Sequence, residues 1–134
     1  SQYKEFNLYL SKEQSQQVFT AEFNFKNGLG SAIIWGYQDN HHFWYAQWNG
    51  ADAFDIMEVN GGDPVKRDSF ILPMAFEPAV LHTLRVASDG SRLEIYFDDM
   101  LRYSEELATQ AGAVGYLTDD MVEIGGYLPI GGVF

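Results

Sequence analysis

The stretch SAIIWGYQDNHHFWYAQWNG, residues 31–50, decides the fold. Its first part, 31–37, is rich in apolar and β-branched side chains, and its last part, 43–48, consists of four aromatic residues with Ala46 and Gln47. The polar residues 38–42 separate the two runs, and Asn49-Gly50 closes the second run with a pair that favours a tight turn. This stretch therefore predicts two adjacent antiparallel strands.

Short runs of the same character continue on both sides of this hairpin. Each is rich in residues that favour strands and is bounded by Gly, Asn, Asp or Pro. Only 104–110 has a helix-like composition, for one or two turns. Short strands at intervals of about 8–12 residues are typical of a sandwich or barrel, so we predict an all-β fold, a two-sheet antiparallel β-sandwich, as a single domain over 1–134. The expected strands are 3–10, 18–25, 31–37, 43–48, 54–59, 66–72, 80–87, 92–97, 100–103, 113–117 and 121–127.

Alternation along a strand predicts which side chains face the core. In 31–37 we expect Ile33, Trp35 and Tyr37 to face inward. Ile34 and Gly36 would then face outward, where a glycine would leave room for a ligand. In 43–48 both sides of the strand carry aromatic residues, so one set must be exposed or covered by a loop. This surplus of aromatic side chains is the strongest functional indication in the sequence.

Composition excludes several classes of function. The 134 residues include 8 Lys and Arg against 19 Asp and Glu, for a formal charge of −11, and they contain no cysteine. This charge disfavours binding to nucleic acid and to anionic lipid, and no apolar run is long enough for a membrane-spanning helix. Because the sequence starts at Ser1 without a basic and apolar leader, we expect a processed, secreted protein of bacterial-type export, extracellular or on the cell surface.

Two parts of the chain look like a known family. The hairpin 30–39 and 43–48, and the later segments 82–86, 89–99 and 112–116, resemble the concanavalin A-like jelly rolls in order and spacing. These include laminin-G-like modules and bacterial carbohydrate-binding modules. The resemblance spans 18–126 and implies a jelly roll, but that fold serves lectins, enzymes and adhesion modules alike.

A sugar site combines flat aromatic rings with side chains that bond hydroxyl groups. The two strands at 43–48 and 54–59 supply both, and further candidates come from later strands on the same or the opposite sheet. The alternative is that these aromatic rings belong to the core and that the polar groups are merely solvated. The candidate ligand-binding residues are Trp44, Tyr45, Gln47, Trp48, Asn49, Asp55, Glu58, Arg67 and Tyr96.

The segment 53–58 also resembles the catalytic strand of family-16 glycoside hydrolases. Asp55 and Glu58 match that pattern, but Ala53 occupies the position of the nucleophile. Without that carboxylate a retaining mechanism has no covalent partner. We therefore expect no catalytic residues, and the match suggests only that Asp55 faces the ligand.

Loop carboxylates could hold a structural calcium ion, which laminin-G-like relatives often contain. The polar turn 39–42 and the pair Asp119-Asp120 are the places to look, although the sequence does not identify the ligands. His41 and His42 are adjacent in sequence and would point apart, which disfavours zinc. No cofactor is required by anything in the sequence.

These observations predict a noncatalytic, lectin-like carbohydrate-binding module, cut from a larger secreted glycan-active enzyme or adhesin. Its partner would be an oligo- or polysaccharide, neutral rather than anionic, and other domains of the same parent chain could contact it. Two alternatives stay open. One is a protein-binding adhesion or scaffold module of laminin-G type, and the other is a family-16-like glycoside hydrolase.

Overall fold

The fold consists of two antiparallel sheets. The computed structural model describes residues 7–10, 18–25, 32–72, 80–118 and 124–130. These residues contain eleven strands and no helix, and hence no helix that could cross a membrane. The strands are β1 (Asn7–Leu10), β2 (Phe19–Phe25), β3 (Ala32–Asp39), β4 (His42–Trp48), β5 (Ala53–Asn60), β6 (Val65–Ile71), β7 (His82–Ser88), β8 (Arg92–Phe97), β9 (Met100–Glu106), β10 (Ala113–Thr118) and β11 (Ile124–Ile130).

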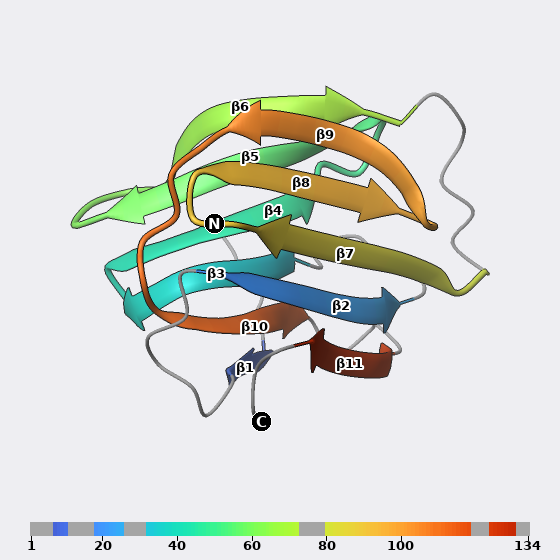
Figure 1. Ribbon diagram of the computed structural model, residues 1–134, viewed down its shortest axis with the longest axis horizontal. Coiled ribbons are helices and arrows are strands. Elements are labelled where there is room, and N and C mark those ends of the chain that lie inside the picture. The colour runs from blue at the N-terminus through green and yellow to red at the C-terminus, as the bar shows by residue number, and fades with distance from the viewer. Residues whose placement is uncertain (1–6, 11–17, 26–31, 73–79, 119–123, 131–134) are drawn as a thin grey trace.

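The two sheets stack face to face, as Figure 1 shows. One has six strands in the order β1-β10-β3-β4-β5-β6, and the other has five in the order β11-β2-β7-β8-β9. The edge strands β6 and β9 lie side by side at the top of Figure 1, and Tyr103 of β9 donates a hydrogen bond of 2.9 Å to Asp68 of β6. The predicted all-β sandwich is confirmed.

Aromatic side chains fill the space between the sheets. The rings of Trp35 and Trp44 stack with centroids 6.4 Å apart. The ring centroid of Phe54 lies 5.3 Å from that of Phe70 on the neighbouring strand and 5.8 Å from that of Phe97 on the opposite sheet. Such ring contacts stabilise the fold beyond the contribution from burial of the large apolar surface. Much of the aromatic surplus in the sequence therefore stabilises the fold.

The expected helix at 104–110 is wrong. Strand β9 continues to Glu106, which pairs with Arg92 of β8. Beyond it, the backbone N–H groups of Leu107 and Thr109 donate to carbonyls in the 90–91 turn at 3.0 and 3.3 Å. The backbone groups of this segment are satisfied by the neighbouring hairpin, which outweighs the local helix propensity.

The expected room for a ligand beside Gly36 is also absent. Gly36 has a φ of +60° at a β-bulge in the β3–β4 pairing, and its carbonyl accepts a 2.7 Å hydrogen bond from Gln110. A Cβ at Gly112 would lie 2.4 Å from the backbone of Gly36, so two chain segments pack closely here. Ile34 does face outward, yet it is only 1% exposed. Because the bulge resets the alternation, Tyr37 faces away from the core rather than into it.

Candidate functional site

The outer face of the six-stranded sheet is the surface that the predicted sugar site has to use. In β4, the side chains of Trp44, Ala46 and Trp48 point into the core, whereas Tyr45 and Gln47 point outward and are partly exposed. Trp44 and Trp48 are 8% and 6% exposed, so the prediction that they stack on a ligand is wrong. The second aromatic set of this strand, which includes Tyr45, is the one at the surface.

Strand pairing arranges the outward side chains over β3 to β6 in two parallel rows. Residues directly opposite each other on paired strands share a face, and successive rows on one face lie about 7 Å apart. One row is Ile34, Tyr45, Met57 and Lys66, and the other is Ala32, Gln47, Asp55 and Ser69. We call Tyr45, Gln47, Asp55, Met57, Lys66 and Ser69 the β4–β6 face. It places the apolar surfaces of Tyr45 and Met57 next to a polar row, which is the combination that a sugar ring needs.

A line of aromatic rings runs from Tyr45 along β4 to Phe43 and from there to Tyr37 of β3. The ring centroids of Tyr37 and Phe43 are 5.4 Å apart, and those of Phe43 and Tyr45 are 5.8 Å apart. All three side chains are partly exposed. The alternation of 43–48 already indicated Phe43, but Tyr37 was missed because only the bulge at Gly36 turns it outward.

The polar row carries a carboxylate with unused bonding capacity. Asp55 Oδ1 lies 3.4 Å from Lys66 Nζ, yet this buried oxygen accepts no hydrogen bond from any described residue. Burial, and then the negative charge of Asp55, raises the pKa of Tyr45 above its usual value. Strand register makes Asp55 the diagonal neighbour of Tyr45, about 7–8 Å away on the same face, so one ligand can contact both.

Glu58 and Arg67 do not belong to this face. Glu58 lies opposite Trp44 on the side of the sheet that faces the core, and its Oε1 accepts a 2.9 Å hydrogen bond from Arg67 Nε. The expectation that Asp55 and Glu58 bind one ligand together is wrong, because residues three apart on a strand point to opposite faces. Counting along 53–60 would have separated the two carboxylates.

Two further candidates have other roles. The Asn49 side chain organises the turn between β4 and β5, where its Oδ1 accepts hydrogen bonds from the backbone of Ala51, Asp52 and Ala53. Tyr96 lies on β8 in the five-stranded sheet, with the Arg85 guanidinium 4.1 Å from its ring centroid. The outer faces of the two sheets lie on opposite sides of the sandwich, so Tyr96 cannot share a ligand with Tyr45.

The structure gives no support to a particular metal site. Asp39 Oδ1 accepts hydrogen bonds from the His42 ring and the His41 backbone at 2.8 and 2.7 Å, and these bonds lower the pKa of Asp39. Among the described residues, no three His, Asp or Glu side chains gather in a way that could hold a metal ion. Asp119 and Asp120 lie outside the described residues, and the calcium ion stays a prediction.

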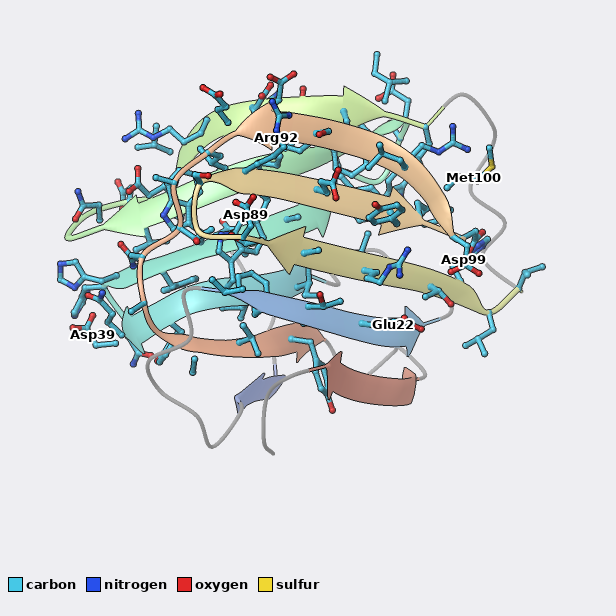
Figure 2. The ribbon with its side chains drawn as sticks, in the orientation of Figure 1. Glu22, Asp39, Asp89, Arg92, Asp99 and Met100 are labelled. Carbon is cyan, nitrogen blue, oxygen red and sulfur yellow. The ribbon has the colours of Figure 1, made fainter. Side chains whose placement is uncertain are left out.

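A pocket of about 330 Å³ lies on the five-stranded sheet. It is lined by Val18, Ala87, Ser88, Asp89, Arg92 and Glu94. Figure 2 shows Asp89 and Arg92 at this end of the sheet, with Asp99 and Met100 at the other. None of the described residues that line this pocket is aromatic, whereas the β4–β6 face presents Tyr45 as a surface on which a sugar could stack.

Solved structures of other proteins share this fold. A carbohydrate-binding module of type CBM66 from Bacillus subtilis superposes with a TM-score of 0.76 at 19% identity, over 96% of this chain and 83% of that one. A Bacillus subtilis protein of unknown function with a galectin-like fold superposes with a TM-score of 0.71 at 6% identity, over 99% of this chain and 80% of that one. A toad ovary galectin in complex with thio-digalactose gives 0.62 at 10% identity, over 96% and 100%.

Sequence comparison adds nothing to this, since no protein-family model and no curated protein matches the chain. At these identities the likeness establishes the fold alone, a jelly-roll β-sandwich. The function has to be argued from the β4–β6 face itself.

Proposed function

We propose that this protein is a noncatalytic, lectin-like module that binds a neutral oligo- or polysaccharide on the β4–β6 face. The observation that carries the proposal is the pair of rows on this face. Tyr45 and Met57 offer apolar surface to the C–H groups of a sugar ring, and Gln47, Asp55 and Ser69 lie one row away to bond its hydroxyls.

The proposal is supported by the shared fold. One similar structure is named a carbohydrate-binding module, and another is a galectin in complex with a digalactoside. Because shallow polar sites gain little from displacing water, we expect dissociation constants on the order of 10 μM to 1 mM. The formal charge of −11 disfavours an anionic glycan and suits the surface of an exported protein.

Affinity electrophoresis tests the proposal directly. The protein is run through gels that contain a neutral glucan, galactan, mannan or fructan, and at least one should retard it. Tyr45→Ala should be retarded less than the wild type, whereas Tyr96→Ala, which removes the same side chain from the opposite sheet, should be retarded as much as the wild type. If no neutral polysaccharide retards the wild-type protein, the proposal is wrong.

Tryptophan fluorescence suits this test poorly. All three tryptophans, Trp35, Trp44 and Trp48, are at most 8% exposed, so a ligand on the β4–β6 face cannot stack on them. Ligand binding is better followed by electrophoresis or by NMR.

A specific observation favours the protein-binding alternative as a second candidate. Val80 and Leu81 before β7, and Met100 and Leu101 after the β8–β9 turn, lie at the same end of the five-stranded sheet and are 45–55% exposed. Exposed apolar side chains at one end of a sheet suit contact with another protein domain. A full glycan panel without binding, together with retention by another domain of the parent chain, would favour this second function.

A further inference from the structure

The β4–β6 face contains one loose ion pair. Lys66 Nζ lies 3.4 Å from Asp55 Oδ1, which is longer than the usual 2.7–2.9 Å of a charge-assisted hydrogen bond. The Lys66 side chain is 57% exposed, and that of Asp55 is 28% exposed. Asp55 Oδ1 is buried and accepts no hydrogen bond from the described residues, and the exposed part of the Asp55 side chain is where a ligand can approach the carboxylate.

A β-bulge between β5 and β6 determines which basic side chain reaches this carboxylate. The pairing steps from Ile56 opposite Asp68 to Met57 opposite Lys66, which leaves Arg67 as the extra residue. Lys66 is thereby directed to the outer face, and Arg67 is paired with Glu58. The bulge thus places an ammonium group, with three donors and a flexible stem, beside Asp55.

We propose that Asp55 and Lys66 together recognise two neighbouring free hydroxyl groups on a neutral sugar ring, an inference that rests on the proposed function. One hydroxyl donates to the exposed side of the Asp55 carboxylate, and its neighbour accepts a hydrogen bond from Lys66 Nζ. A hydroxyl group both donates and accepts, so two adjacent hydroxyls can replace the loose contact between the ammonium and the carboxylate. Lys66 stands at the end of the row that contains Tyr45 and Met57, which contact the C–H groups of the same ring.

This pair also selects against other classes of ligand. A sugar that places a carboxylate against Asp55, or a free amine against Lys66, would be repelled. A sugar that is methylated or lacks a hydroxyl at either position would leave a buried acceptor or a donor without its partner. The pair is therefore specific for two adjacent, unsubstituted hydroxyls.

The test uses four probes, the methyl glycosides of glucose, galactose, mannose and fructose, and measures their dissociation constants by NMR titration. Asp55→Asn and Lys66→Met should each raise the dissociation constant of the best-bound glycoside at least tenfold. The matched control is Arg67→Met, which removes the neighbouring cation from the opposite side of the strand and should stay within twofold of the wild type. Circular dichroism of each variant verifies that it is folded.

A second set of probes identifies the hydroxyls. Deoxy analogues of the best glycoside should lose the most affinity at two adjacent positions, and Lys66→Met should remove the penalty at one of them. If Asp55→Asn and Lys66→Met bind within twofold of the wild type while Tyr45→Ala does not bind, the inference is wrong and the proposed function stands. If neither the glycosides nor the neutral polysaccharides bind the wild-type protein, both are wrong.

Discussion

Trp44 and Tyr45 are neighbours in β4 with opposite roles, and substituting each by alanine separates the core from the ligand face. Trp44 is 8% exposed and stacks on Trp35 at 6.4 Å. Truncating a buried aromatic residue costs about 3–5 kcal/mol in free energy of unfolding. In a domain of this size the melting temperature falls by about 4 °C per kcal/mol, so Trp44→Ala should lower it by about 12–20 °C.

Tyr45→Ala should have the opposite effect, with little loss of stability and a marked loss of ligand binding. Its side chain is partly exposed on the outer face, so its removal should cost about 1 kcal/mol of stability, or about 4 °C. Loss of its stacking surface should weaken binding of a neutral polysaccharide by about 1–2 kcal/mol, which is roughly five- to thirtyfold. The variant that barely changes stability is thus the one that loses binding.

Both quantities can be measured on the same samples. Thermal and urea unfolding give the stability of each variant, and affinity electrophoresis gives its binding at a temperature where both are folded. The assignment of faces is refuted if Trp44→Ala shifts the melting temperature by less than about 5 °C. It is equally refuted if Tyr45→Ala is as unstable as Trp44→Ala.

Three further predictions concern the framework. Gly112→Ala should lower the free energy of unfolding by about 3 kcal/mol or more, because the new Cβ would lie 2.4 Å from the carbonyl carbon of Gly36. An unchanged midpoint of urea unfolding would contradict this packing. Tyr103→Phe should cost about 1–3 kcal/mol through loss of the bond to Asp68. Burial, and then that bond, raises the pKa of Tyr103, so the unfolded chain loses this proton first and stability falls as the pH rises above about 10. Tyr103→Phe should therefore lose less stability at alkaline pH than the wild type. If the two proteins lose stability equally as the pH rises, Tyr103 does not cause the loss. The Asp89 carboxyl should titrate by NMR below its usual range, because it accepts hydrogen bonds from the backbone of the hairpin turn; an ordinary midpoint would contradict those bonds.

The sequence was sufficient for the architecture because alternation and turn residues are local. In β8, alternation puts Leu93, Ile95 and Phe97 on one side of the strand, and all three are buried. Alternation failed at β-bulges, since an extra residue reverses every later side chain on the strand. The bulge at Gly36 moved Tyr37 outward, and nothing in the local sequence distinguishes this bulge from a simple glycine in a strand.

Only part of the candidate site could be predicted, because the face on which a side chain lies depends on strand register and on bulges. Tyr45, Gln47 and Asp55 share the outer face because strand register places them there, and register depends on contacts that are distant in sequence. Trp44 was assigned to the ligand because aromatic composition does not indicate which side of a strand is buried. Lys66 was not among the candidate residues, because its place beside Asp55 depends on the β5–β6 bulge.

The central claim is that a neutral sugar binds on the outer face of β4, β5 and β6. The most direct test is a two-dimensional ¹H–¹⁵N NMR titration of the assigned protein with the neutral polysaccharide that retards it most. We predict that the largest shift changes fall on Tyr45, Gln47, Asp55 and Lys66. Changes confined to the five-stranded sheet, around Ala87, Glu94 and Tyr96, would contradict the claim.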